Sequence, residues 1–177
     1  LGRIGKEVIR IGRGFGMQVA AFDPFPNREY AAANGFTYLT LDELLATSDV
    51  VSVHCPLTPE THHLLNRENL LRVKRGAILV NTARGPIVET GAIVAALERG
   101  ALAGAGLDVL EEEGEIKDEV HFLTQGHPKQ AELEALLATH VLLAHPNVLI
   151  THHNAFNSQE AFERILQEAC ERYPANL

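Results

Sequence analysis

The sequence lacks several features that would point to particular classes of protein. Its 177 residues carry 15 Lys and Arg against 23 Asp and Glu. This acidic balance argues against nucleic acid as a partner, because phosphate binding calls for a basic surface. No apolar run approaches the roughly 20 residues of a membrane-spanning helix. The only two cysteines, Cys55 and Cys170, are far apart and form no metal-ligand spacing. A reduced, cytoplasmic setting is therefore expected.

The sequence also lacks an initiator methionine and opens inside a glycine motif. Leu1-Gly-Arg-Ile-Gly5 has the spacing of the end of G-x-G-x-x-G, without the first glycine and the strand before it. We therefore expect residues 1–177 to be a dinucleotide-binding domain that is incomplete at its N-terminus.

What is present is an alternation of amphipathic segments and short apolar runs. Apolar positions at helical spacing predict helices at 4–15, 28–33, 41–47, 67–72, 91–99 and 131–141, and a last helix capped by Ser158. Apolar runs predict strands at 17–22, 36–39, 49–54, 77–82, 102–109 and 148–151. Thr90 is expected to cap the helix at 91–99, and residues 110–130 are expected to be irregular. The alternation predicts an α/β fold with a doubly wound, Rossmann-like parallel sheet whose first strand is missing.

Three charged side chains follow three separate predicted strands. They are Arg84, Glu113 and His153. The carboxyl ends of parallel strands meet at one edge of the sheet, where open α/β sheets bind ligands. A cation, an acid and an imidazole gathered there could hold a carboxylate and move a proton. Taken singly, each residue could equally be a solvated surface group, and the residues alone do not choose among the glutamates at 111–113.

The glycine motif and Asp23 together predict a nucleotide site. Glycines at a strand-to-helix turn let the backbone approach a pyrophosphate at the helix N-terminus. Asp23 ends the next predicted strand, about 20 residues further on, where a carboxylate can accept from ribose hydroxyls. Its charge would repel a 2′-phosphate, so NAD is favoured over NADP. A packing role for the glycines and a turn role for Asp23 are the alternatives.

Long motifs, in one order along the chain, resemble those of the D-isomer-specific 2-hydroxyacid dehydrogenases. The cofactor loop covers residues 1–24, and Val51 to Thr61 matches a further block. The arginine, glutamate and histidine signatures are matched by residues 80–88, 104–113 and 146–156. Asn154-Ala-Phe156 and the insertion before residue 146 are most like the D-lactate dehydrogenases. One departure is His152, where the family commonly has proline.

The resemblance implies an NAD-dependent enzyme that interconverts a lactate-like D-2-hydroxy acid and its 2-keto acid. In the implied mechanism His153 is the base, Glu113 orients it, and Arg84 binds the substrate carboxylate. Asp108 would bind the nicotinamide carboxamide, and Asn81 would line the same rim as Thr82. The full set of implied cofactor contacts is Gly2, Arg3, Ile4, Gly5, Asp23, His54, Pro56, Thr61, Thr82, Ala83, Asp108 and His153.

The resemblance further implies a homodimer of a longer protein, with a substrate domain that residues 1–177 do not include. Two other readings stay open: an NAD(H)-sensing module, like the corepressor that shares this fold, and an inactive fragment with an unpaired sheet edge. No metal is expected. Thr61-His-His63 and His152-His153 show no Cys or carboxylate partner at ligand spacing.

Overall fold

The computed structural model describes residues 1–111, 130–155 and 157–172. Its strands are β1 (Ala20–Ala21), β2 (Thr37–Tyr38), β3 (Val50–Val53), β4 (Ala77–Asn81), β5 (Leu102–Leu107) and β6 (Val148–Ile150). Its helices are α1 (Arg3–Gly14), α2 (Arg28–Asn34), α3 (Leu41–Thr47), α4 (Arg67–Leu70), the 3₁₀ helix η1 (Gly85–Ile87), α5 (Thr90–Glu98), α7 (Gln130–Ala144) and α8 (Gln159–Arg172). Each predicted helix and strand is present, and the α/β class is confirmed.

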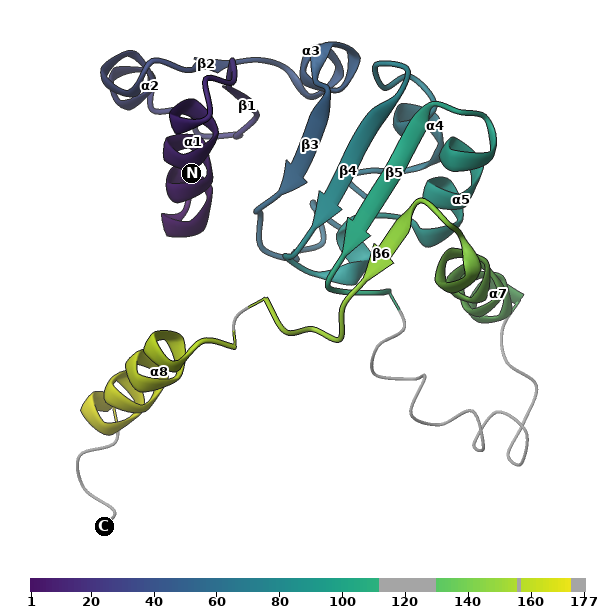
Figure 1. Cartoon of the computed structure of the whole chain (residues 1–177). Coiled ribbons are helices and arrows are strands. Elements are labelled where there is room, and N and C mark those ends of the chain that lie inside the picture. Colours follow the sequence, from purple (N-terminus) through teal and green to yellow (C-terminus); the bar gives the residue numbers. More distant parts are fainter. Residues whose placement is uncertain (112–129, 156, 173–177) are drawn as a thin grey trace.

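The strands form two parallel groups. β3, β4, β5 and β6 make a four-stranded sheet in that order, and β1 pairs with β2 (Figure 1). This division agrees with the prediction of a doubly wound parallel sheet whose first strand is missing. The break lies between β1 and β3, which is where a doubly wound order places the strand that precedes the glycine turn. With one ladder partner among the described strands, the run predicted at 17–22 is reduced to Ala20–Ala21.

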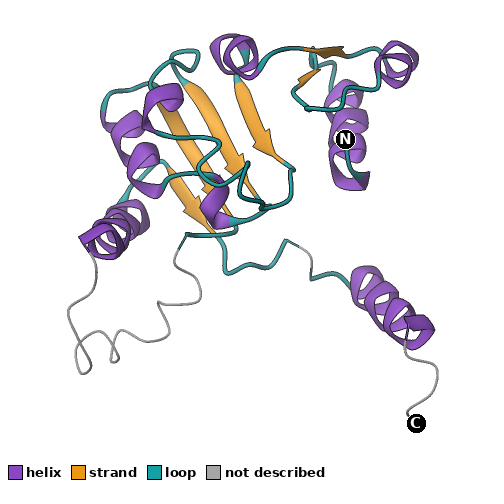
Figure 2. Ribbon diagram, turned by 180° about the vertical axis from the view of Figure 1, so that it is seen from behind, coloured by secondary structure: helices purple, strands orange, loops and turns teal. Residues whose placement is uncertain are grey.

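One face of the four-stranded sheet carries the core. α4, α5 and α7 lie on this face (Figures 1 and 2). Val51 and Val53 of β3 and Leu79 of β4 point into the core, where they pack with Ile93 and Ala96 of α5. Burying these side chains stabilises the fold by about 25 cal/mol per Å² of apolar surface removed from water.

The opposite face of the same sheet is open among the described residues. Side chains alternate between the faces of a strand, so the neighbours of the core residues point the other way. Val50, Ile78 and Leu149 are 47%, 44% and 68% exposed.

Local hydrogen bonds fix where several helices begin. Thr40 and Glu43 form a capping box at α3, and Ser158 Oγ accepts from the Ala161 N–H at the start of α8, as predicted. The predicted cap by Thr90 is wrong. Thr90 is the first residue of α5 and gives its N–H and its hydroxyl to Glu111, a residue from a distant segment.

None of the helices in residues 1–111, 130–155 and 157–172 is both long enough and apolar enough to cross a membrane.

Candidate active site

The loops that carry the predicted catalytic residues meet at the carboxyl edge of the sheet. The arrowheads of β3, β4, β5 and β6 end at one edge in Figure 1, because the strands are parallel. Arg84 follows β4 and His153 follows β6. Glu113 follows β5 but lies outside the described residues, so its position relative to His153 stays a prediction.

The Arg84 loop is fixed from below by a buried amide. Asn81, the last residue of β4, is 1% exposed. Its Nδ2 donates to the Arg84 carbonyl at 3.0 Å, and its Oδ1 accepts from the Ala83 N–H at 3.0 Å. The expectation that Asn81 lines the rim is therefore wrong: it supports the loop from inside. The Arg84 side chain is exposed, where a guanidinium can meet a carboxylate in solution.

The His153 loop is fixed by a buried carboxylate. Asp108 is 4% exposed, just beyond β5. Its Oδ1 accepts from the Thr151 hydroxyl at 2.5 Å and from the Asn154 N–H at 2.8 Å, and its Oδ2 accepts from the Ala155 N–H at 2.8 Å. The Asp108 carbonyl accepts from the His153 N–H at 2.9 Å. Asp108 therefore sets the position of the whole His153 loop.

The charge of Asp108 matches this role. Burial raises the pKa of Asp108, but the hydrogen bonds from Thr151, Asn154 and Ala155 and the charge of His153 lower it by more, so the pKa lies below its ordinary value. The carboxylate is thus ionised at neutral pH. This anchoring role was not predicted from the sequence. The contact of Asp108 with the nicotinamide carboxamide stays a prediction, in addition to the anchoring role.

His153 has an unusual backbone conformation. Its φ is +47°, in the left-handed region that non-glycine residues rarely adopt. Such a conformation persists where surrounding contacts determine it, and it is frequent at functional sites. Here the contacts are the bonds to Asp108 on both sides of His153.

A hollow lies beside these loops. Its volume is about 550 Å³, and Thr82, Asp108, Thr151, His152 and Asn154 are among the residues that line it. The structure thus brings together Thr82 and Asp108, two of the predicted cofactor contacts from different strands.

A second group of predicted cofactor contacts gathers at the start of α1. Gly2 caps this helix without a side-chain hydrogen bond, and a Cβ at Gly2 would meet nothing within 4 Å. Gly5 is buried, and a Cβ there would lie 3.7 Å from the Cβ of His54. Asp23 follows β1 and comes within 2.5 Å of the Leu1 nitrogen. An open helix N-terminus beside a carboxylate fits a dinucleotide. Arg3 and Ile4, on the first turn of α1, are exposed.

The charges at this end have physical causes. Asp23 accepts a hydrogen bond from the Phe25 N–H at 2.8 Å, which favours its charged form. Burial lowers the pKa of His54, which is hydrogen-bonded to Ser52 through Nε2 at 2.8 Å. Asp23 is therefore an acceptor and His54 is neutral at pH 7.

Pro56 and Thr61, two of the predicted cofactor contacts, hold together the loop after β3. The Thr61 hydroxyl donates to the Pro56 carbonyl at 2.6 Å and accepts from the Thr58 N–H at 2.8 Å. Their predicted role toward the cofactor is compatible with this, because the loop they shape follows β3 at the same edge.

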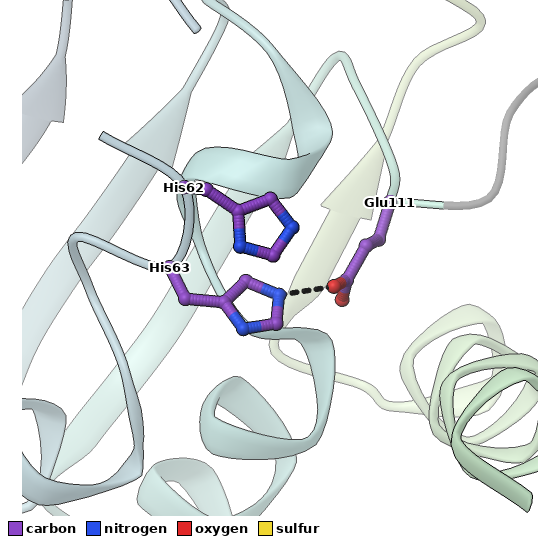
Figure 3. A group of neighbouring side chains, drawn as sticks. All are labelled: His62, His63 and Glu111. Atoms are coloured by element: carbon purple, nitrogen blue, oxygen red, sulfur yellow. Dashed lines mark hydrogen bonds and ion pairs between the residues drawn. The ribbon is translucent and has the colours of Figure 1, made fainter. Parts of the chain in front are cut away.

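The loop after β3 also carries the histidine pair His62 and His63. His63 is hydrogen-bonded through Nε2 to Glu111, and the rings of His62 and His63 lie side by side, 4.0 Å apart between centroids (Figure 3). The histidine pair was expected to lack a carboxylate partner. Glu111 provides one from 48 residues away in the chain. Sequence spacing could not show it, because the contact joins two different loops.

Comparison with known proteins agrees with the geometry. Residues 1–155 match the family model described as the D-isomer specific 2-hydroxyacid dehydrogenase, NAD binding domain. The chain belongs to this family. The predicted family, the Rossmann-like class and the NAD cofactor are thereby confirmed.

Several relatives are similar over most of the chain. A 2-hydroxyacid dehydrogenase homolog of Zymomonas mobilis is 42% identical over 166 residues, which cover 93% of this chain and 48% of the relative. The D-lactate dehydrogenase of Treponema pallidum is 39% identical over 165 residues, 93% of this chain and 47% of the relative. The chain therefore spans about half the length of the curated relatives it matches.

Solved structures of the family superimpose closely. The D-lactate dehydrogenase of Aquifex aeolicus, solved in complex with NAD and lactic acid, has a TM-score of 0.82 and 39% identity, and the match covers 98% of this chain and 50% of that one.

A close backbone contact in this family member gives a first prediction. Gly85 packs against the peptide that joins Leu110 to Glu111, and a Cβ at Gly85 would overlap both the carbonyl and the following nitrogen. We expect Gly85→Ala to lower the free energy of unfolding by about 1–3 kcal/mol, the usual cost of overpacking. Denaturant melts of the protein that contains this chain would measure it.

Gly91 is the matched control for Gly85. It lies in the first turn of α5, and a Cβ there would meet nothing within 4 Å. Gly91→Ala is expected to be neutral or stabilising, since alanine favours a helix over glycine by up to about 1 kcal/mol. Equal stability of the two alanine variants would contradict the close contact at Gly85.

Proposed function

We propose that the protein containing this chain interconverts a lactate-like D-2-hydroxy acid and its 2-keto acid, with NAD as the hydride carrier. The observation that carries the proposal is the pair of buried anchors at one sheet edge. Asn81 fixes the loop of Arg84, and Asp108 fixes the loop of His153. Because the two anchors lie on neighbouring strands, the cation and the imidazole whose loops they fix can act on one small acid.

Arg84 would bind the carboxylate of the substrate. Its guanidinium offers donors in a planar fork, which matches the two oxygens of a carboxylate. The same charge would polarise the oxygen on C2 of a keto acid, next to the carboxylate. Arg84 is exposed while Asn81 fixes its backbone, which supports this role; one guanidinium nitrogen donates to the Ala83 carbonyl at 2.6 Å.

His153 would move the proton. In the oxidative direction the hydroxyl on C2 gives its proton to the imidazole as the C2 hydrogen leaves with its electron pair. Bound NAD would supply the hydride acceptor at C4 of its nicotinamide, and NADH would supply the hydride in the reverse direction. Glu113 is proposed to orient the imidazole and to stabilise its charged form, as a carboxylate does in a catalytic triad.

Turnover of 2-keto acids tests the proposal. The full-length protein, supplied with NADH, should oxidise it in the presence of pyruvate or a longer straight-chain 2-keto acid, followed by the loss of absorbance of the reduced cofactor. Only the D-hydroxy acid should support the reverse reaction. Binding of NADH without turnover of any 2-keto acid would instead favour an NAD(H)-sensing module.

The choice of NAD over NADP is proposed to depend on Asp23. Its ionised carboxylate lies beside the start of α1, where a 2′-phosphate would meet like charge. We expect Asp23→Ser to raise kcat/KM with NADPH relative to NADH by about tenfold, equivalent to ~1.4 kcal/mol. Asp42→Ser, an exposed acid on α3, is the control and should leave the ratio unchanged. An unchanged ratio in Asp23→Ser would remove Asp23 from the cofactor site.

A further inference from the structure

The 3₁₀ helix η1, which follows Arg84 directly, is held between two loops. On one side the His63 N–H donates to the Pro86 carbonyl at 2.9 Å. On the other side Gly85 packs on the peptide that precedes Glu111, with no room for a Cβ. A shift of either loop is therefore passed to the backbone of Arg84.

The carboxylate of Glu111 joins these two loops. One oxygen is hydrogen-bonded to His63 Nε2 (Figure 3). The other accepts from the N–H and the hydroxyl of Thr90 at 2.9 and 2.7 Å. Burial raises the pKa of Glu111, but the hydrogen bonds from Thr90 and His63 lower it by more, so the pKa lies below its ordinary value. Glu111 is a charged acceptor that ties the loop after β3 to the start of α5.

The backbone of His63 shows that this tie constrains the loop. His63 has φ of +50°, and His153 is the other non-glycine residue with positive φ in the described part of the chain. Strained backbone conformations are kept where surrounding contacts determine them. For His63 those contacts are the bond from its N–H to Pro86 and the bond from its ring to Glu111.

The same group could be read as a metal site. One ligand atom each from His62, His63 and Glu111 lies within 4.8 Å of the other two. Both oxygens of Glu111 already accept hydrogen bonds, from His63 and from Thr90, and an ion would have to break the first of these. The hydrogen-bonded arrangement therefore accounts for His63 and Glu111 without an ion, whereas a metal site would also require His62.

We propose that His63 and Glu111 form a positioning pair that holds η1 between two loops and so fixes Arg84 for its contact with the substrate carboxylate. This inference rests on the proposed function, since it concerns the affinity for the 2-keto acid. The pair acts through the backbone of η1 and touches neither the substrate nor the cofactor. Its loss should therefore change the binding of the acid and leave the binding of NADH intact.

His63→Asn in the full-length protein tests the pair. Asparagine tolerates positive φ, so the loop keeps its backbone, but its side chain is too short to reach Glu111. We expect KM for the 2-keto acid to rise about tenfold, with kcat within about threefold of the wild type. Kd for NADH, measured by fluorescence titration, should be unchanged.

A double-mutant cycle and a control sharpen the test. If the two residues act as a unit, Glu111→Ala should raise KM about as much as His63→Asn, and the double variant should raise KM no further. His62→Asn should leave KM unchanged. An equal effect of His62→Asn would point to a metal site and overturn the proposed pair, and additive effects of His63→Asn and Glu111→Ala would overturn it too.

The outcomes separate the two proposals. Absence of turnover by the wild-type protein with every 2-keto acid would remove the proposed function and the positioning pair with it. Turnover by the wild type together with an unchanged KM in His63→Asn would remove the pair alone. A drop in melting temperature without a change in KM would likewise mean that His63 stabilises the fold and does not position Arg84.

Discussion

Replacing His153 by asparagine is expected to lower kcat by about 10²–10⁴-fold, the contribution of a positioned general acid–base group. The physical reason is that the asparagine amide cannot accept the proton that the imidazole takes from the C2 hydroxyl. Asparagine is the suitable replacement because it tolerates the left-handed backbone, with φ of +47°, that His153 adopts. The loop held by Asp108 should therefore survive, and KM should change little.

A matched histidine provides the control for this loss. His140 is exposed on α7 and belongs to none of the loops that follow β3, β4, β5 and β6. His140→Gln should keep full activity. If His153→Asn retained more than a tenth of the wild-type kcat, His153 would not be the proton carrier, and the mechanism proposed for this family member would need another base.

Replacing Asp108 by asparagine is expected to damage both stability and activity. The carboxylate accepts from Thr151, Asn154 and Ala155, and an amide would turn one accepting oxygen into a donor that faces another donor. Hydrogen bonds to a charged, buried group contribute about 1.5–3 kcal/mol each, so a loss of about 2–3 kcal/mol in the free energy of unfolding is expected. Because His153 moves with its loop, kcat/KM should fall by about 10²-fold.

Thr151→Val is the graded control for Asp108. It removes only the hydroxyl that donates to Asp108 and leaves the two backbone donors in place. Its effect on stability should lie at the low end of that range, about 1.5 kcal/mol, and below that of Asp108→Asn. Wild-type kcat/KM in Asp108→Asn would show that the carboxylate does not set the His153 loop.

The dependence of stability on pH in the acid range gives a second test of the role of Asp108. Its pKa is lowered in the folded protein from the ordinary value of 3.8. Its contribution is therefore fully present above about pH 4 and is lost as the pH falls through the lower folded pKa. Stability of the wild type should fall more steeply below pH 4 than that of Asp108→Asn, in urea melts across that range.

Local signals predicted most of the secondary structure. Helical spacing and caps such as Thr40 and Ser158 act within a few residues, so they can be read from the sequence. The split of the sheet could not be read in this way, because strand pairing depends on which neighbours are present. The cap at α5 was wrong for a similar reason: Thr90 bonds to Glu111, 21 residues away.

For the site, the sequence singled out candidates but not the contacts that support them. Arg84 and His153 were proposed because each follows an apolar run and resembles a family signature, and their catalytic roles stay predictions. Asn81 and Asp108 carry a usable signal, a polar side chain at the end of an apolar run, and such residues are buried only with hydrogen-bond partners. The pairing of His63 with Glu111 has no local signal, since it joins two loops.

A crystal structure of the full-length protein with NADH and oxamate, a non-reacting analogue of pyruvate, would test the central claim most directly. We expect the Arg84 guanidinium on the oxamate carboxylate and the His153 imidazole within hydrogen-bond reach of the neighbouring oxygen, with Glu113 on the far side of the ring. Oxamate bound to other residues, with Arg84 and His153 unable to touch it together, would contradict the account.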